Sequence, residues 1–314
     1  MKLNSVGILV TYRCPIRCDH CYINCGPHRT EVIDLDLAER LLRQVREVGL
    51  TGSHVHLGGG EAFVVFKRIV EVLEIADRLD MTPVDWVETN CFWCTSDGIV
   101  RQRLTTLKEA GLKRMWLSTD PYHQEHVPLE NVRRARDIGV DIFGEDNVVT
   151  SQHEYFERPE QWPDVAAYVN AFPPMLMGRA YECLRQHLPR RPLSEFTEEQ
   201  CANCIDPTEM TFDHINPDGT VMATNCSGVI IGDARETTLA QLHSDPDWRQ
   251  NDILRSLADH GPMGLLDMAP EFEPRETYAQ KCELCWEVRS HLAPSYPEAL
   301  APPECYTDPH GSSG

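Results

Sequence analysis

The sequence lacks the features that mark membrane proteins and nucleic-acid-binding proteins. Its 314 residues contain no run of the about 18 apolar residues that a membrane-spanning helix needs, and no secretory signal at the N-terminus. Basic residues are few, since 29 Lys and Arg stand against 49 Asp and Glu, which gives a formal charge of -20. Such a chain has no broad basic face for phosphate groups or anionic lipids. We therefore expect a cytoplasmic protein that binds a small molecule or a peptide, and neither nucleic acid nor a membrane.

Internal repeats and long low-complexity tracts are also missing, which excludes a solenoid and a disordered chain. With 41% hydrophobic and 25% charged residues, the composition is that of one or two globular domains. What the sequence does have is 13 cysteines. In a reducing cytoplasm, cysteine clusters more often bind metals or carry out redox chemistry than form disulfides.

The first 180 residues or so alternate short apolar runs with longer amphipathic segments, which is typical of a parallel sheet with helices packed against it. We expect six strands, at residues 5–10, 54–57, 84–89, 114–119, 141–150 and 175–179. Helices are expected at residues 36–48, 65–79, 99–110, 129–138 and 162–170. The pattern predicts an α/β fold, a partial (β/α)6 barrel of the TIM type, over residues 1–190.

Beyond residue 190 the alternation stops, which predicts a second, smaller α+β domain over residues 191–309. The Asp-Gly pair at residues 218–219 predicts a β-hairpin between 210–215 and 220–224, because this dipeptide accepts the positive φ angles of tight hairpin turns. Helices are expected at residues 239–243, 246–259 and 283–292. We expect residues 310–314 to be a tail outside the fold.

Three cysteines follow the first expected strand with the spacing C-x3-C-x2-C: Cys14, Cys18 and Cys21. One loop with three thiolates this close together can wrap a single four-iron cluster, and three ligands for four irons leave one iron open. A zinc ion would require a fourth ligand, and His20 lies between the cysteines with an awkward reach. We therefore predict an iron–sulfur site at this loop.

This triplet resembles the signature of the radical S-adenosylmethionine (SAM) enzymes, in which it follows the first strand of a partial barrel. The resemblance implies a [4Fe-4S] cluster whose open iron binds SAM, and reductive cleavage of SAM to a 5′-deoxyadenosyl radical that removes a hydrogen atom from the substrate. It also implies an electron donor of the flavodoxin or ferredoxin type. Two departures, His20 in place of an aromatic residue and Ala62 in place of proline, concern adenine packing and loop shape rather than the cluster.

Segments at the ends of later strands are similar to the SAM-binding segments of that family. Gly58-Gly59-Gly60-Glu61 resembles the segment that holds the amino group of SAM: glycines let the backbone approach a ligand, and a glutamate can accept from an ammonium group. The resemblance places further polar residues near the ribose and the carboxylate of SAM. These residues are Asn90, Ser118, Asp120 and Arg179.

The second domain contains two C-x2-C pairs, Cys201 with Cys204 and Cys282 with Cys285. Residues 205–281 separate the pairs, far more than the roughly 15–20 residues of a compact zinc ribbon. Beside a radical SAM core, this arrangement resembles the twitch domain, a shortened SPASM domain that binds an auxiliary [4Fe-4S] cluster. The resemblance implies two [4Fe-4S] clusters in all, and the alternative at the second set is zinc or no metal.

Cys226 is left over if the two pairs supply all four ligands. In similar radical SAM peptide epimerases, a cysteine returns a hydrogen atom to the substrate radical from the opposite face, which turns an L-residue into a D-residue. The resemblance therefore implies that Cys226 is a hydrogen-atom donor. In the alternative, Cys226 replaces Cys201 or Cys204 as a cluster ligand.

Other cysteines carry weaker signals. We interpret Cys25, Cys91 and Cys94 as small apolar residues that pack around the cavity, because free cysteine is among the most buried residue types. The sequence assigns no role to Cys305. The pair His123 and His126 has a spacing that suits a metal, but it lies in a polar segment, and we assign no metal to it.

As a whole, the resemblance implies a maturase of ribosomally made peptides (RiPP maturation), most specifically a peptide epimerase. A second possibility is two-electron oxidation or cross-linking of a peptide through thioether or carbon–carbon bonds, or dehydrogenation of a small molecule, with the auxiliary cluster as electron acceptor. A non-catalytic iron–sulfur or zinc scaffold is the alternative from a different class. No motif identifies the substrate or the modified residue.

Overall fold

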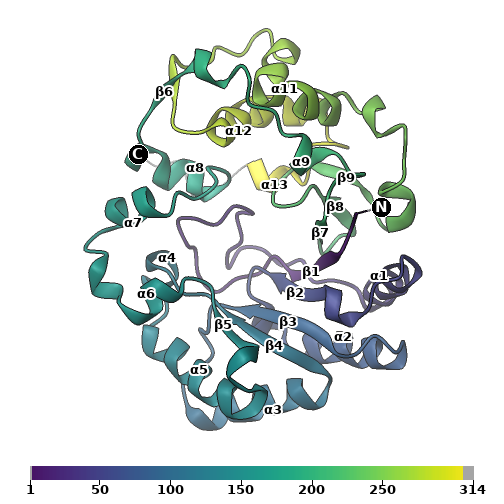
Figure 1. Ribbon diagram of the computed structural model, residues 1–314, viewed down its shortest axis with the longest axis vertical. Coiled ribbons are helices and arrows are strands. Elements are labelled where there is room, and N and C mark those ends of the chain that lie inside the picture. Colours follow the sequence, from purple (N-terminus) through teal and green to yellow (C-terminus); the bar gives the residue numbers. More distant parts are fainter. Residues whose placement is uncertain (1, 307–314) are drawn as a thin grey trace.

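An eight-stranded sheet lies at the centre of the molecule, with the strand order β5-β4-β3-β2-β1-β7-β8-β9 (Figure 1). The computed structural model describes residues 2–306. Five neighbouring strands are parallel: β1 (Ser5–Thr11), β2 (Val55–Gly59), β3 (Val84–Thr89), β4 (Leu112–Leu117) and β5 (Val148–Thr150). Parallel strands have their carboxyl ends at one edge of the sheet, so the loops that follow β1 to β4 meet there.

Helices connect the parallel strands and pack against the sheet (Figure 1): α1 (Leu35–Glu47), α2 (Phe66–Arg78), α3 (Asp97–Glu109) and α5 (Leu129–Phe143). Helix α1 shows why these segments are helical. The side chain of Asp34 caps its first turn, and the buried residues Leu37, Leu41 and Val45 recur at four-residue intervals on one face. This face and the buried side chains of β1 to β4 form one hydrophobic core.

The α/β partial-barrel fold is confirmed, with two local corrections. The expected fifth strand is only Val148–Thr150, because residues 141–143 complete helix α5. The expected sixth strand at residues 175–179 is absent: residues 175–178 are irregular, and helix α8 (Arg179–Leu184) begins there. Gly178, with φ 56°, turns the chain into that helix, and the prolines at 173 and 174 cannot donate to a strand ladder. Residues 1–190 therefore contribute five parallel strands to the sheet, β1 to β5.

Shorter helices follow β4 and β5: α4 (Pro121–Gln124), α6 (His153–Glu157) and α7 (Val165–Ala171). The C-terminal part contains the expected antiparallel hairpin, β7 (Phe212–Ile215) with β8 (Thr220–Met222), followed by β9 (Ile230–Asp233). Its helices are α9 (Ala202–Ile205), α10 (Leu239–Leu242), α11 (Asp252–Met268), α12 (Lys281–Leu292) and α13 (Pro303–Tyr306), beside a two-stranded sheet of β6 (Arg191–Pro192) and β10 (Thr277–Tyr278).

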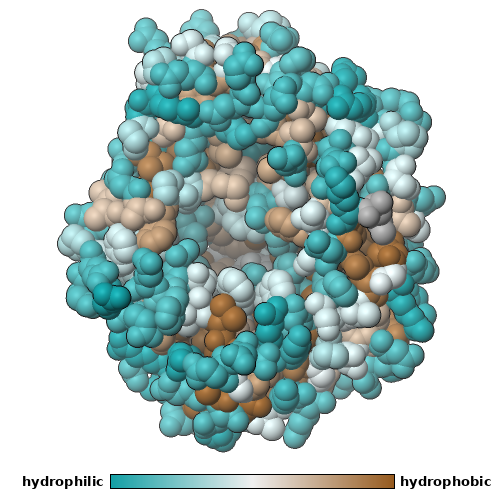
Figure 2. All heavy atoms as spheres, viewed as in Figure 1, coloured by the Kyte–Doolittle hydropathy of each residue, from teal (hydrophilic) through white to brown (hydrophobic). Residues whose placement is uncertain are grey.

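The C-terminal part has its own hydrophobic core, but the main sheet crosses the boundary expected near residue 190, because β7 pairs in parallel with β1. The domain boundaries therefore stay a prediction, and the expected tail at residues 310–314 lies outside the described residues. Between residues 2 and 306, no helix combines the length and the apolar character needed to cross a membrane. The surface in Figure 2 is largely hydrophilic and is hollowed in its middle, between the C-terminal helices above and the parallel strands below.

Candidate functional site

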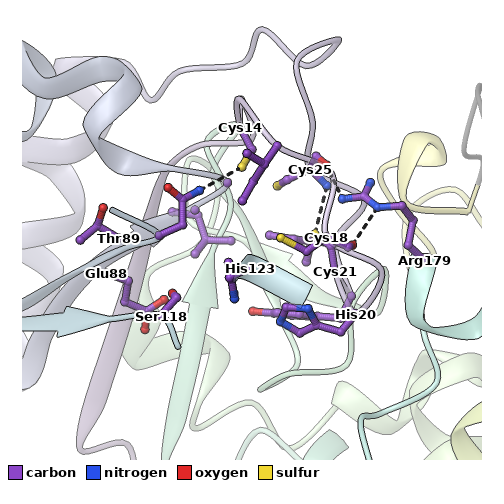
Figure 3. A pocket seen from close by; sticks show the side chains of 17 residues that line it. Cys14, Cys18, His20, Cys21, Cys25, Glu88, Thr89, Ser118, His123 and Arg179 are labelled. Atoms are coloured by element: carbon purple, nitrogen blue, oxygen red, sulfur yellow. Dashed lines mark hydrogen bonds between the residues drawn. The ribbon is translucent and has the colours of Figure 1, made fainter. Parts of the chain in front are cut away.

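The three cysteines of the first loop lie in one cavity at the carboxyl edge of the parallel strands (Figure 3). The cavity has a volume of about 190 Å³. Its walls are the cysteine loop after β1, the ends of β2, β3 and β4, and the start of helix α8. The lining residues used below are Cys14, Cys18, Cys21, Cys25, Gly59, Gly60, Glu88, Asn90, Ser118, His123 and Arg179.

Arg179 fixes the shape of the cysteine loop. Its Nε donates to the carbonyl of Cys18 at 3.0 Å and its Nη2 to the carbonyl of Cys25 at 2.6 Å, while its backbone N–H donates to the carbonyl of Cys21 at 3.1 Å. Gly178 is required beside it, since a Cβ atom there would lie 2.6 Å from the Cys21 carbonyl oxygen. The Nη1 atom of Arg179 is buried without a hydrogen-bond partner. The expected SAM-carboxylate partner therefore lines the cavity with one donor unused.

The glycine-rich segment is only partly exposed to the cavity. Gly59 and Gly60 line it, whereas Gly58 does not. A Cβ atom on Gly59, whose φ is 139°, would lie 2.3 Å from the carbonyl oxygen of Thr11. These glycines are thus needed where β2 passes close to the end of β1, in addition to any approach of a ligand.

Glu61 is buried and does not line the cavity, and its carboxylate is hydrogen-bonded to neighbouring groups of the protein. Its carboxylate accepts from the backbone N–H groups of Phe63 and Asn90, at 3.0 and 2.7 Å, and from the Thr89 hydroxyl at 2.9 Å. Burial raises the pKa of Glu61 to about 7 despite these hydrogen bonds. Glu88, on β3, is the carboxylate that lines the cavity, and burial raises its pKa too. The role of Glu61 as a SAM ligand stays a prediction, and Glu88 is a candidate that the sequence analysis missed.

This arrangement gives a test of the two carboxylates. Glu61→Ala is expected to lower the free energy of unfolding by about 3–5 kcal/mol, because it leaves three buried donors without an acceptor. The matched variant Glu88→Gln is expected to change stability by less than about 1 kcal/mol and to weaken SAM binding. Urea unfolding and calorimetric SAM titration of the reconstituted protein measure both effects. A Glu61→Ala protein of normal stability that binds SAM weakly would reverse the two roles.

Asn90 and Ser118 line the cavity as expected, and the Asn90 side chain lies 3.7 Å from the sulfur of Cys14. Asp120 does not line it. Its carboxylate caps helix α4 by accepting from the N–H of His123 at 2.9 Å, and it lies 2.7 Å from His123 Nδ1. A contribution of Asp120 to SAM binding therefore stays a prediction, and its observed partner is His123.

His123 is a cavity residue that the sequence analysis set aside. The ligand atoms of Cys18, His20 and His123 lie within 4.8 Å of one another. Burial lowers the pKa of His123, but the carboxylate of Asp120 and the nearby sulfur of Cys18 outweigh it, so the pKa is well above its usual range. Asp120 thus orients a positively charged donor toward one of the predicted cluster ligands. The i,i+3 spacing of Asp120 and His123 was the only sequence signal for this contact.

The C-terminal cysteines converge from three segments. Cys201 and Cys204 lie at helix α9, Cys282 and Cys285 lie in the first turns of α12, and Cys226 lies in the loop between β8 and β9. The charges of Cys282, Cys285 and Cys204 all act on Cys201, which places the two pairs near one another. The Lys281 ammonium donates to the carbonyl of Gln200 at 2.7 Å and ties α12 to the segment before α9.

Cys226 lies with these cysteines and not in the first cavity. Its thiol donates to the sulfur of Cys204, which lowers the pKa of Cys204 to about 6 and raises that of Cys226. Both residues line a second cavity of about 380 Å³, together with Met175 and Phe212. The structure therefore gathers five thiols where a cluster needs four.

The spacing of these sulfurs bears on which metal they suit. Zinc–sulfur bonds of about 2.3 Å in a tetrahedron place the sulfurs of a zinc site roughly 3.8 Å apart. Within the described chain, no three C-terminal cysteines lie within 4.8 Å of one another. In a four-iron cube the thiolates bind separate irons, which places their sulfurs farther apart than in a zinc site.

The remaining cysteines differ in environment. Cys91 and Cys94 are fully buried in the main hydrophobic core, as the packing interpretation expects, but they do not line the cavity. Cys25 does line it, and its thiol donates to the sulfur of Cys21, which lowers the pKa of Cys21. Cys305 is buried in α13 with Met177, Tyr181 and Trp286, and its carbonyl accepts from the Asn24 side chain at 2.7 Å.

Comparison with known proteins shows what this chain is similar to. Residues 8–143 match the model of the radical SAM superfamily. The chain is 24% identical over 149 residues to YydG of Bacillus subtilis (strain 168), a protein named for peptide biosynthesis, with 45% of this chain and 46% of that protein covered. It is 25% identical over 138 residues to the GTP 3′,8-cyclase of Clostridium botulinum (strain Hall), with 44% and 40% covered. The matches thus span about half of the curated relatives or less.

Among solved structures, native anSMEcpe with bound AdoMet and a Cp18Cys peptide superposes with a TM-score of 0.50 at 11% sequence identity. The superposition covers 94% of this chain and 98% of that chain. It therefore shows a shared fold that includes the C-terminal part. Cys14, Cys18, Cys21 and the glycine-rich segment all fall within the residues that match the superfamily model.

Proposed function

From the premise that the protein is a radical SAM enzyme, we propose that it modifies a ribosomally made peptide by removing a Cα hydrogen atom, and that the outcome is L-to-D epimerisation. The observation that carries the proposal is the first cavity, where three cysteines of one loop meet glycines, an amide, a carboxylate and a guanidinium. The peptide substrate is supported by the name of YydG and by the peptide bound to anSMEcpe.

The residues of the first cavity fit a SAM-binding [4Fe-4S] cluster. Cys14, Cys18 and Cys21 would hold three of its irons, and the unpartnered Nη1 of Arg179 is available to an anionic group beside them. Gly59, Gly60, Glu88, Asn90 and Ser118 would contact SAM. When bound, cluster and SAM supply a 5′-deoxyadenosyl radical that takes a hydrogen atom from the substrate. An electron donor of the flavodoxin or ferredoxin type would reduce the site.

In the second set of cysteines, Cys201, Cys204, Cys282 and Cys285 would hold an auxiliary [4Fe-4S] cluster, as in a twitch or SPASM domain. Cys226 would then donate a hydrogen atom. The hydrogen bond that its thiol donates to Cys204 raises the pKa of Cys226, and burial raises it further. Transfer of that hydrogen breaks the S–H bond, forms the new Cα–H bond and leaves a thiyl radical, which one electron and one proton restore to the thiol. The substrate loses one hydrogen and gains one, so its mass is unchanged.

One observation favours a second candidate function. Cys226 lies against Cys204 and away from the first cavity, as a cluster ligand would. In that case the auxiliary cluster would accept an electron from the substrate radical. The reaction would be a two-electron oxidation or cross-link of a peptide, or dehydrogenation of a small molecule.

Turnover with a candidate peptide in D₂O separates these functions. For epimerisation, we expect one deuterium at Cα and a D-residue after hydrolysis, because thiol hydrogens exchange with solvent. Mass spectrometry and chiral amino-acid analysis measure the two. A product two hydrogens lighter, without deuterium at Cα, would establish oxidation or cross-linking instead. Incubation without reductant is the control and should leave the peptide unchanged.

A further inference from the structure

Arg289, on helix α12, is a buried cation without a carboxylate partner. It is only 1% exposed. Its Nη1 donates to the carbonyl of Ser227 at 2.7 Å and contacts the Tyr306 hydroxyl at 3.2 Å, its Nη2 lies 3.3 Å from the sulfur of Met177, and its Nε has no hydrogen-bond partner. A guanidinium group keeps its proton in proteins, so this charge stays in the interior.

Comparison with the other buried arginines shows what is unusual here. Three arginines of the described chain are buried: Arg29, Arg179 and Arg289. Arg29 pairs with the carboxylate of Glu31 at 2.6 Å. Arg179 and Arg289 pair with no carboxylate in residues 2–306, and each lies at one of the two cysteine sets. Burying a charge without a counter-charge strongly destabilises the folded protein, so we expect an anion beside each of these two arginines.

The groups beside Arg289 that can carry negative charge are mainly thiols. Its positive charge acts on Cys285, which precedes it by one helical turn, and on Cys226 and Cys282. Residues i and i+4 share a helix face, so α12 presents Cys285 and Arg289 to the same site. At the first cavity, Arg179 donates to backbone carbonyls of the cysteine loop, and its charge acts on Cys21.

We propose that Arg289 is the counter-ion of an anionic iron–sulfur cluster held by the C-terminal cysteines, and that it raises the reduction potential of this cluster. The inference rests on the auxiliary cluster of the proposed function. A four-iron cluster with four thiolate ligands carries net negative charge, and reduction adds one more. A buried cation beside the ligand sulfurs stabilises the reduced form, which makes the cluster a better electron acceptor.

The test uses the full chain with Cys14, Cys18 and Cys21 changed to alanine, so that only the C-terminal cluster remains. In this background, Arg289→Lys keeps the charge, whereas Arg289→Gln removes it and keeps polar hydrogen-bonding groups. Arg255→Met, an exposed arginine of α11, is the control. Iron, sulfide and zinc are counted after anaerobic reconstitution, and the midpoint potential is measured by EPR-monitored redox titration.

We expect Arg289→Gln to lower the midpoint potential by at least about 59 mV, a tenfold change in the electron-transfer equilibrium. Arg289→Lys and the control should stay within that range of the parent. Loss of iron in Arg289→Gln alone would support the proposal in the same way. Equal midpoints for Lys and Gln, or loss of iron in both, would overturn it while the auxiliary cluster stands. No iron, or zinc alone, in the parent with Arg289 intact would overturn the auxiliary cluster itself and the proposal with it.

Discussion

Replacing Cys14, Cys18 and Cys21 together by alanine is expected to lower the iron content from about eight to about four per chain and to abolish SAM cleavage. The three thiols lie in one cavity, and of the other cysteines in the described chain only Cys25 lines it. The C-terminal cysteines, which line no part of this cavity, should keep their iron. The measurement is an iron, sulfide and zinc count on anaerobically reconstituted protein, with 5′-deoxyadenosine formation assayed in parallel.

A control is the double variant Cys91→Ala and Cys94→Ala, which removes two buried thiols that line neither cavity. It should retain about eight irons and full SAM cleavage. If the wild-type protein binds about four irons and the Cys14, Cys18 and Cys21 variant binds none but retains zinc, the C-terminal cysteines bind zinc. That outcome would remove the electron acceptor on which the oxidation candidate depends.

The sequence predicted the parallel strands well where a strand is a continuous apolar run. Strand β1 is buried along its whole length after Ser5, and its apolar run is evident from composition alone. The strand expected at residues 175–179 was wrong, because two prolines and a glycine with a positive φ angle precede helix α8 there. The pairing of β7 with β1 could not be predicted either, because it joins residues about 200 positions apart and no local sequence pattern identifies the partner of a strand.

Within the site, local motifs identified residues but not which way they face. The cysteine spacing predicted the loop, yet the choice between Glu61 and Glu88 depends on side-chain direction at two strand ends. His123 was assigned no role because it lies in a polar segment, and its neighbour Cys18 is distant in sequence. Arg289 stands four residues after Cys285, a spacing visible in the sequence. Its burial and its lack of a carboxylate are properties of the packed C-terminal core.

Cys226→Ala is expected to abolish formation of the D-residue while 5′-deoxyadenosine is still produced, because hydrogen abstraction does not require this thiol. The iron content should stay at about eight, since the two C-x2-C pairs still supply four ligands. Chiral analysis of the hydrolysed peptide and quantification of 5′-deoxyadenosine measure the two reactions. The contrasting variant is Cys25→Ala, because Cys25 is the one non-ligand thiol of the predicted set that lines the first cavity.

The two variants assign the hydrogen donor by their pattern. If Cys25→Ala, and not Cys226→Ala, stops epimerisation, the donor is the thiol beside Cys21 in the first cavity. If Cys226→Ala halves the iron content, Cys226 is a cluster ligand, and its hydrogen bond to Cys204 reflects two neighbouring ligands in the absence of iron. A cluster with four thiolate ligands would then use Cys226 and only three of the four cysteines in the C-x2-C pairs. Cys204 is the candidate to leave, because it is the exposed member of the set and the others are at least partly buried.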